Sequence, residues 1–328
     1  MSEESIFAQK PLEGEPWEIA IIGSGPASLT AAIYTTRGAA STLILGGESW
    51  GGQLMLTTTV DNYPGFPDGI QGPDLMNLMR KQAERFGAEF ISKNVEFVDF
   101  TKTPKQLVAG GVTYLAKTVI IATGADTKWL GVPGEEKLRG RGVSSCAPCD
   151  APFFKGKDVL VVGGGDAAME EALVLTKYAS NVTIIHRKDE FKASAAMQAK
   201  VYEAQKKGKI NILLNTEVIE FLGDSKLEKV KIKNSKTGEA SELPIDGAFV
   251  AIGHVPSTSA LVGKVDLDEK GYVRQLADEF RTATNIDGVF VAGDVHDYHY
   301  RQAITAAGFG CMAAMDSLKY LDKSGPSW

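Results

Sequence analysis

The length, composition and charge of the chain exclude several classes of protein. Its 328 residues can form two domains with cores of their own, and 44% hydrophobic and 23% charged residues are ordinary for a globular protein. The formal net charge of -6 argues against nucleic acid or an anionic membrane as the main partner. No apolar run reaches the roughly 20 residues of a membrane span. The acidic N-terminus lacks the apolar stretch of a signal peptide, so we expect a cytoplasmic protein.

Two segments of the chain repeat one pattern of an apolar strand, a glycine-rich turn, a helix and a second strand. The first copy occupies residues 19–22, 23–25, 26–37 and 42–45, and the second occupies residues 159–162, 163–165, 166–178 and 182–185. The four strands are short continuous apolar runs, which is typical of buried parallel strands. The repeat therefore predicts two nucleotide-binding domains of related fold.

Each copy continues into short alternating strands, at residues 95–118 and 217–243, and closes with a strand and a glycine, at 119–124 and 249–253. The last segment, 289–321, fits neither copy and is expected to return to the first domain. The predicted class is α/β, with two Rossmann-like (three-layer ββα) domains that each carry a small antiparallel β-meander. The second domain, 126–253, would be inserted in the first, which takes residues 1–125 and 254–328.

The first glycine-rich turn, Gly23-Ser24-Gly25-Pro26-Ala27, follows a strand and opens a helix, as a pyrophosphate site requires. Ser28 replaces the third glycine of the usual motif, which predicts slightly looser packing, and only Glu48 stands near the expected acid. A turn without a ligand is the alternative. Asp294 ends a later strand, where its carboxylate can accept from a ribityl hydroxyl or form a simple Asx turn.

The second turn is followed by a basic cluster. Its motif is Gly163-Gly164-Gly165-Asp166-Ala167, and about twenty residues later the second strand ends in His186-Arg187-Lys188, with Lys192 nearby. A domain that binds NAD usually has an acid here, whereas cations suit the 2′-phosphate of NADP. The alternative is a solvated basic face.

The chain has three cysteines, and Cys146 and Cys149 form a Cys-x-x-Cys pair followed by Asp150. Such a pair can close a reducible disulfide, and a neighbouring carboxyl can protonate a leaving thiolate. The ligands are too few for structural zinc, so no metal is expected. An inert dithiol is the alternative. We interpret Cys311 as a small core residue at the start of an apolar helix.

Taken together, these motifs resemble the low-molecular-weight thioredoxin reductases of the class II pyridine nucleotide-disulfide oxidoreductase family along nearly the whole chain. The shared motifs also include Gly51-Gly52-Gln53-Leu54, Asp61-Asn62-Tyr63-Pro64-Gly65, Ala122-Thr123-Gly124 and Arg301-Gln302-Ala303. The resemblance implies a homodimer that binds FAD in the first domain and NADPH in the second.

The resemblance also implies site residues. FAD would be bound by Gly23, Ser24, Gly25, Pro26, Ala27, Gly51, Gly52, Gln53, Leu54, Asn62, Ala122, Thr123, Gly124, Gly293, Asp294, Arg301, Gln302 and Ala303. NADPH would be bound by Gly163, Gly165, Asp166, Ala167, His186, Arg187, Lys188 and Lys192. Cys149 would lie next to the flavin, Cys146 would attack the disulfide of thioredoxin, Asp150 would be the acid, and Phe153 and Phe154 would dock thioredoxin.

The function implied is thioredoxin-disulfide reduction, with electrons passing from NADPH to FAD, then to the Cys146–Cys149 disulfide and to thioredoxin. The family rotates one domain against the other between half-reactions, and we expect the hinge near Gly124 and Gly253. Two alternatives stay open. One is a related flavoprotein that acts on another dithiol or disulfide, or takes electrons from NADH or ferredoxin. The other is a flavin-bound redox sensor without turnover.

Overall fold

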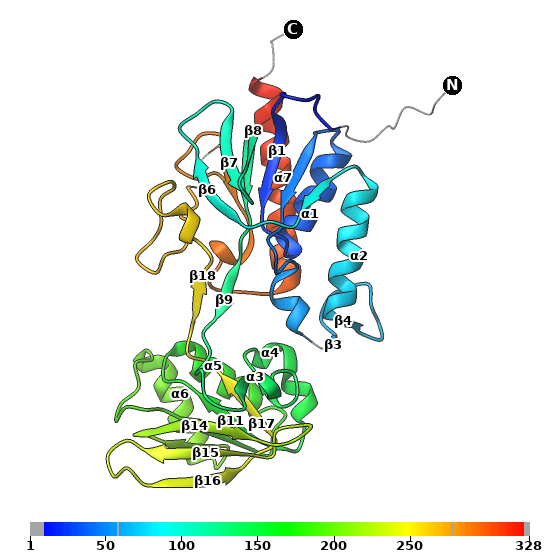
Figure 1. Ribbon diagram of the computed structural model, residues 1–328. Helices are drawn as coiled ribbons and strands as arrows, with labels where there is room; N and C mark the ends of the chain where they lie inside the picture. Colours follow the sequence, from blue (N-terminus) through cyan, green and yellow to red (C-terminus); the bar gives the residue numbers. More distant parts are fainter. Residues whose placement is uncertain (1–9, 58, 277–278, 325–328) are drawn as a thin grey trace. The chain divides into compact units, whose positions relative to one another are not determined.

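The structure, a computed structural model, describes residues 10–57, 59–276 and 279–324 (Figure 1). The sequence predictions for residues 1–9 and for the tail beyond 324 lie outside this part of the chain. The chain divides into two compact units. Unit 1 takes the chain up to Asp126 and from Val255 onward, and unit 2 is Thr127–His254.

Unit 1 is built on a mixed sheet with the strand order β5-β2-β1-β8-β7-β6, in which β19 also pairs with β8. Its strands are β1 (Trp17–Ile22), β2 (Thr42–Leu45), β5 (Glu89–Ile91), β6 (Val95–Asp99), β7 (Lys105–Ala109), β8 (Val112–Ile121) and β19 (Val289–Val291), with a separate pair β3 (Thr59–Val60) and β4 (Ile70–Gln71). Its helices are α1 (Pro26–Arg37), α2 (Gly72–Arg85) and α7 (Ala303–Ser324), with short 3-10 turns η1 (Gly52–Leu56), η3 (Ser259–Leu261) and η4 (Gly293–Val295).

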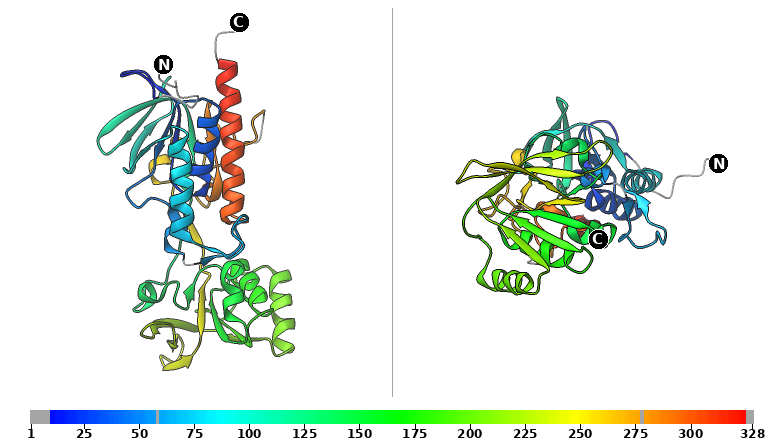
Figure 2. Two further views of the ribbon diagram at one scale, coloured as in Figure 1. Left: turned by 90° about the vertical axis from the view of Figure 1, so that its right-hand side faces the viewer. Right: turned by 90° about the horizontal axis from the view of Figure 1, so that it is seen from below.

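Side chains of β1 alternate between two apolar cores, and this makes unit 1 a three-layer structure. Ile19 and Ile21 point to the core shared with α1, α2 and α7. Ala20 and Ile22 point to a second core beneath the meander strands β6 and β7. Because both faces of the sheet are covered, its central parallel strands contain continuous apolar runs, such as Ile19–Ile22 in β1 and Leu43–Leu45 in β2. Figure 2 shows the three helices side by side along one side of this sheet.

Strand β8 differs from the prediction, which ended the short alternating strands at residue 118 and began a separate closing strand at residue 119. It is continuous, because no glycine or proline interrupts residues 112–121. Its first half pairs antiparallel with β7, and its second half pairs in parallel with β19. The C-terminal segment thus completes the sheet of unit 1.

Unit 2 repeats the architecture around a parallel sheet with the order β10-β17-β11-β12-β13. The strands are β10 (Val143–Ser144), β11 (Asp158–Val162), β12 (Asn181–Ile185), β13 (Ile210–Leu213) and β17 (Gly247–Val250), and the meander is β14 (Thr216–Leu222), β15 (Lys229–Asn234) and β16 (Ala240–Pro244). The helices are α3 (Glu135–Leu138), α4 (Ala147–Asp150), α5 (Asp166–Leu175) and α6 (Ala195–Lys206), with the 3-10 turn η2 (Ala151–Phe154). The chain passes between the units through β9 (Ala125–Thr127) and β18 (His254–Pro256), which pair with each other (Figure 1).

The alternation seen in β1 recurs in β11. Val159 and Val161 face the core with α5 and α6, and Leu160 and Val162 face the core with the meander. Helix α5 ends at Leu175, three residues earlier than predicted, because Lys177 and Tyr178 make tighter turn bonds to residues three positions back. The predicted α/β class with two Rossmann-like sheets is confirmed.

Candidate active site

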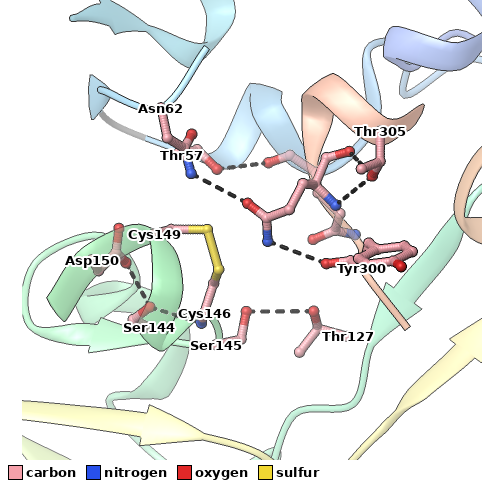
Figure 3. Close-up of a disulfide and its surroundings, with 12 residues drawn as sticks. Thr57, Asn62, Thr127, Ser144, Ser145, Cys146, Cys149, Asp150, Tyr300 and Thr305 are labelled. Atoms are coloured by element: carbon pink, nitrogen blue, oxygen red, sulfur yellow. Dashed lines mark hydrogen bonds between the residues drawn. A yellow bond between two sulfur atoms is a disulfide. The ribbon is translucent and has the colours of Figure 1, made fainter. Parts of the chain in front are cut away.

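The Cys-x-x-Cys pair forms a disulfide at the start of the one-turn helix α4 (Figure 3). The backbone amides of Cys149 and Asp150 donate to the carbonyl oxygen of Cys146 at 3.2 and 3.1 Å. This turn brings the two cysteine Cα atoms to 5.3 Å, and both residues are partly exposed. A partly exposed disulfide can be reached by an attacking thiolate, whereas a core disulfide cannot.

Asp150 is held beside the disulfide by a side chain that sequence reasoning missed. Ser144 Oγ donates to Asp150 Oδ2 at 2.6 Å and accepts from the backbone amide of Cys146 at 3.1 Å (Figure 3). Burial raises the pKa of the Asp150 carboxyl, and the hydrogen bond from Ser144 opposes that rise. The raised pKa lets Asp150 keep its proton to a higher pH than a free aspartate does, which suits a proton donor. Ser144 lies in the two-residue strand β10 and belongs to no recognisable motif.

The structure separates the two aromatic residues predicted to dock thioredoxin. Phe153 is 44% exposed and is available to a partner. Phe154 is buried, and its ring packs edge-on against Phe249 with the ring centres 5.2 Å apart. In the part of the chain described, Phe154 is therefore a core residue, and Phe153 alone keeps the predicted docking role.

Cys311 was predicted to be a core residue at a helix start, and both parts of this prediction are wrong. Helix α7 begins at Ala303, so Cys311 lies more than two turns after the start of the helix. The side chain is partly exposed, with Sγ 4.0 Å from the sulfur of Met315. The long apolar stretch after Ala303 hid where the helix begins.

The first glycine-rich turn is packed tightly at one end and open at the other. Gly23 has φ +121°, and a Cβ there would lie 2.1 Å from the carbonyl oxygen of Ala122. A Cβ on Gly25 would meet no described heavy atom within 4 Å. Ser28 is fully buried and donates from Oγ to the same Ala122 oxygen at 3.2 Å. Serine thus secures the helix–strand packing that was expected to be looser.

Ser24 links this turn by hydrogen bonds to the segments around Gly46 and Gly51. Its Oγ donates to the carbonyl oxygen of Gly46 at 2.6 Å and accepts from the amide of Gly51 at 2.9 Å. A Cβ on Gly52 would lie 3.9 Å from Gly25 Cα. The predicted segment Gly51–Leu54, far away in sequence, therefore lies directly beside the predicted pyrophosphate turn.

Asp294 has a buried carboxylate oxygen at the predicted flavin site in unit 1. Its Oδ1 is buried without a hydrogen-bond partner among the described residues, and so is the Oγ1 of Thr123. Burial, aided by the charge of Asp297 and opposed by that of Arg301, raises the pKa of Asp294 to about 7. Buried polar atoms normally have partners. Hydroxyl groups of a bound ribityl chain would supply them, so the donor and acceptor set fits FAD.

The remaining predicted flavin residues also gather in unit 1. Asn62 Nδ2 donates to Gln302 Oε1 at 3.2 Å (Figure 3), and Gln53 Nε2 donates to Asp126 Oδ1 at 3.1 Å. Arg301 has φ +47°, and its Nη2 donates to the carbonyl oxygen of Tyr298 at 2.6 Å. Ala303 begins α7, Pro26 and Ala27 begin α1, and Gly124 and Gly293 take positive φ at strand ends.

The second glycine-rich turn has the same tight and open ends. A Cβ on Gly163 would lie 2.4 Å from the carbonyl oxygen of Ala251, whereas one on Gly165 would meet no described heavy atom within 4 Å. Asp166 Oδ1 accepts from the amide and hydroxyl of Ser194 at 2.9 and 2.7 Å. Ala167 lies exposed in the first turn of α5. The open end again leaves room for a pyrophosphate at a helix N-terminus.

The predicted basic cluster splits into one buried and three exposed residues. His186 is 9% exposed, and its ring lies against the turn, 2.4 Å from where a Cβ on Gly164 would be. Burial lowers the pKa of His186, and the charges of three cations lower it further. These cations are the exposed residues Arg187, Lys188 and Lys192. His186 is therefore a support behind the turn, and the three cations form the exposed charge.

Lys192 is tied to the turn through its backbone. Its amide donates to the carbonyl oxygen of Gly164 at 2.7 Å, and the amide of Ala193 donates to the same oxygen at 3.1 Å. These two hydrogen bonds link the loop that carries the basic charge to the glycine-rich turn.

Two tightly turned Rossmann-like units and a partly exposed disulfide beside a carboxyl define a disulfide oxidoreductase that uses nucleotide cofactors. The chain belongs to the pyridine nucleotide-disulphide oxidoreductase family, which it matches over residues 17–310. Flavin and nicotinamide cofactors are implied by this membership.

Its relatives narrow the class further. The chain is 50% identical over 304 residues to a thioredoxin reductase of Mycolicibacterium smegmatis, covering 93% of this chain and 96% of the relative. It is 49% identical to a bifunctional thioredoxin reductase/thioredoxin of Mycobacterium leprae, covering 93% of this chain and 66% of that protein. A solved thioredoxin reductase from Giardia duodenalis superposes with a TM-score of 0.89 at 42% identity, over 94% of this chain and 99% of the other.

Within residues 10–57, 59–276 and 279–324, no helix has the length and apolar character needed to cross a membrane. Over the same ranges, no group of three or more His, Cys, Asp or Glu side chains is arranged to hold a metal ion.

Proposed function

We propose that this chain is an NADPH-dependent thioredoxin reductase with FAD as its resident cofactor. The observation that carries the proposal is the partly exposed Cys146–Cys149 disulfide with Asp150 held beside it by Ser144. Support comes from the relatives, which are thioredoxin reductases over almost the whole length of this chain. Fusion of a thioredoxin to one relative supports thioredoxin as the partner.

FAD would be held in unit 1 and NADPH in unit 2. For FAD, the turn at Gly23–Ala27 would receive the pyrophosphate, and Asp294 Oδ1 and Thr123 Oγ1 would pair with hydroxyl groups. For NADPH, the turn at Gly163–Ala167 would receive the pyrophosphate, and Arg187, Lys188 and Lys192 would face the 2′-phosphate. When bound, the flavin supplies the hydride chemistry that links nicotinamide to a disulfide.

The dithiol form of the pair reduces the substrate by thiol–disulfide exchange. The Cys146 thiolate attacks one sulfur of the thioredoxin disulfide, which forms a mixed disulfide and releases the other thioredoxin sulfur as a thiolate. Cys149 then attacks the Cys146 sulfur, which re-forms the internal disulfide and releases the thioredoxin sulfur held in the mixed disulfide as the second thiolate. Two electrons leave the enzyme dithiol, and two protons end on the thioredoxin thiols. Asp150 donates a proton to a leaving thiolate.

The flavin site must be open to nicotinamide in one half-reaction and to the Cys146–Cys149 disulfide in the other. The units therefore rotate against each other about β9 and β18. Gly124 precedes β9 with φ +72°, and Gly253 precedes β18 with φ +108°. A Cβ on Gly124 would meet no described heavy atom within 4 Å, and one on Gly253 would meet only Lys128 Cδ, at 3.9 Å. Glycine is used at both positions for backbone freedom, as a hinge requires.

A homodimer and a cytoplasmic location complete the proposal. The homodimer follows from the resemblance to the family, and the cytoplasmic location is the expectation drawn from the sequence.

Steady-state consumption of NADPH with thioredoxin from the same source tests the function. We expect rapid turnover with NADPH, weak turnover with NADH and none with ferredoxin as donor. If NADPH reduces the flavin but thioredoxin stays oxidised, the cofactor assignment survives and another disulfide must be the substrate. If no disulfide reoxidises the protein, it is a flavin-bound sensor and the proposal fails.

A further inference from the structure

An acid lies inside the basic loop that the proposed function assigns to the 2′-phosphate. Asp189 directly follows Arg187 and Lys188, and its side chain is exposed. Its pKa is lowered first by a hydrogen bond from its own backbone amide and then by Lys236, so the group is a carboxylate at neutral pH. An uncompensated carboxylate here would repel a phosphate and would compete with it for the neighbouring cations.

The charge of Asp189 is met by a residue from a different element. Lys236 lies in the hairpin between β15 and β16, and its Nζ is 3.4 Å from Asp189 Oδ2. The hairpin turn is ordered by Asn234, whose Oδ1 accepts from the amides of Lys236 and Thr237 at 2.9 and 3.0 Å. Lys236 is thus presented to Asp189 by a structured turn.

The same hairpin is bound to the basic loop through the backbone. Ser235 Oγ reaches the carbonyl oxygens of Arg187 and Asn215 at 3.3 and 3.1 Å. The amide of Ser235 donates to the Asn215 oxygen at 2.7 Å, and the amide of Asn215 donates to the carbonyl oxygen of Lys188 at 2.9 Å. Three successive residues of the hairpin, from Asn234 to Lys236, therefore take part in fixing the turn or its contact with the loop.

We propose that Lys236 determines specificity for NADPH over NADH by neutralising Asp189, so that the loop presents an undiminished positive charge to the 2′-phosphate. The inference rests on the proposed use of NADPH in unit 2. Lys236 acts through Asp189, so it is a positioning residue. Its side chain and that of Asp189 are 61% and 67% exposed. Such pairs add little to folding, so their removal leaves the fold intact.

The test compares Lys236→Ala with Lys233→Ala in the FAD-loaded enzyme. Lys233 is an exposed cation of the same hairpin with no ion pair among the described residues, so its loss controls for net charge. In Lys236→Ala we expect the KM for NADPH to rise about three- to five-fold, with kcat and the KM for NADH unchanged. Binding of adenosine 2′,5′-bisphosphate, measured by calorimetry, should weaken by the same factor, and binding of 5′-AMP should not change.

Two further variants make the interpretation specific. Asp189→Asn combined with Lys236→Ala should restore wild-type affinity for adenosine 2′,5′-bisphosphate, because the unpaired carboxylate is gone. Lys236→Arg should keep it. The defect of Lys236→Ala should shrink at high ionic strength, where exposed charges are screened.

The outcomes separate this inference from the proposed function. If the wild-type protein binds adenosine 2′,5′-bisphosphate no better than 5′-AMP, the NADPH assignment falls and the inference falls with it. If the wild type prefers the bisphosphate but Lys236→Ala behaves like Lys233→Ala, only the inference is overturned. Equal weakening of both ligands, or no rescue by Asp189→Asn, would also overturn it, because Lys236 would then serve the shape of the loop.

Discussion

Gly25→Ala is expected to give a folded protein that binds FAD about 10- to 100-fold more weakly than the wild type. Gly25 has φ -76°, which alanine adopts freely, and its added Cβ would meet no described heavy atom within 4 Å. The flavin-free protein should therefore fold normally with the added methyl group. The same open space lies at the N-terminus of α1, where a pyrophosphate must approach the backbone closely. The loss of FAD affinity is measured by flavin content after purification and by titration calorimetry with FAD. Retention of the fold is measured by thermal unfolding of the flavin-free protein.

Two matched glycines serve as controls for this prediction. Gly23→Ala places a Cβ 2.1 Å from the Ala122 oxygen at φ +121° and should destabilise the fold itself, by about 3 kcal/mol or more. Gly165→Ala, the equivalent open position in unit 2, should retain FAD and weaken NADPH binding. Full FAD affinity in Gly25→Ala would show that the first turn is not the pyrophosphate site.

Asp150→Asn should lower kcat for thioredoxin reduction about 100-fold, the lower end of what a general acid contributes. Asparagine keeps the size of the side chain and can still accept from Ser144 Oγ, so the disulfide loop should be unchanged. What is lost is the proton that burial helps Asp150 to retain. Because its pKa is raised, the wild-type carboxyl donates below that pKa, and kcat falls as the pH rises through it. This fall of kcat with rising pH should be absent in Asp150→Asn.

The pH dependence of kcat in wild type, Asp150→Asn and Ser144→Ala measures this role. Removing the Ser144 hydroxyl takes away the hydrogen bond that lowers the pKa of Asp150, so the fall of kcat should move to higher pH. An Asp150→Asn variant with wild-type kcat and an unchanged profile would be incompatible with Asp150 as the proton donor.

The regular parts of the fold could be predicted from the sequence because local signals and tertiary packing agree there. Helix α1 was predicted at Pro26–Arg37 and has these bounds in the structure, with Pro26 at its first position and Gly38 after its last. Strand β2, Thr42–Leu45, is buried at every position, and its apolar run Leu43–Leu45 predicts a buried parallel strand.

Helix α2 was not predicted, although it has a signal. Its buried residues Leu75, Met76, Met79 and Ala83 follow a helical period, and Pro73 lies in its first turn. The pattern is diluted by charged residues on the exposed face. Helix α6 was not predicted either. Its apolar stripe, Met197, Val201 and Ala204, is narrow, and only Val201 is fully buried.

The parts of the site that escaped prediction depend on contacts between distant residues. Ser144 is defined as a partner of Asp150 only once β10 and α4 are folded. Lys236 is 47 positions from Asp189, and neither belongs to a motif that links them. Phe153 and Phe154 are chemically identical neighbours, and only their place at the end of η2 decides which one is buried. The roles of the FAD and NADPH residues stay predictions.

The measurement that most directly tests electron relay through the disulfide is NADPH consumption with thioredoxin in wild type, Cys146→Ser and Cys311→Ser. Cys311 is a partly exposed free thiol in unit 1 and is the matched control. We predict rapid consumption in wild type and Cys311→Ser, and none above background in Cys146→Ser, although NADPH still bleaches its flavin. Thioredoxin reduction that persists in Cys146→Ser would contradict the account, because the electrons would then reach thioredoxin by another route.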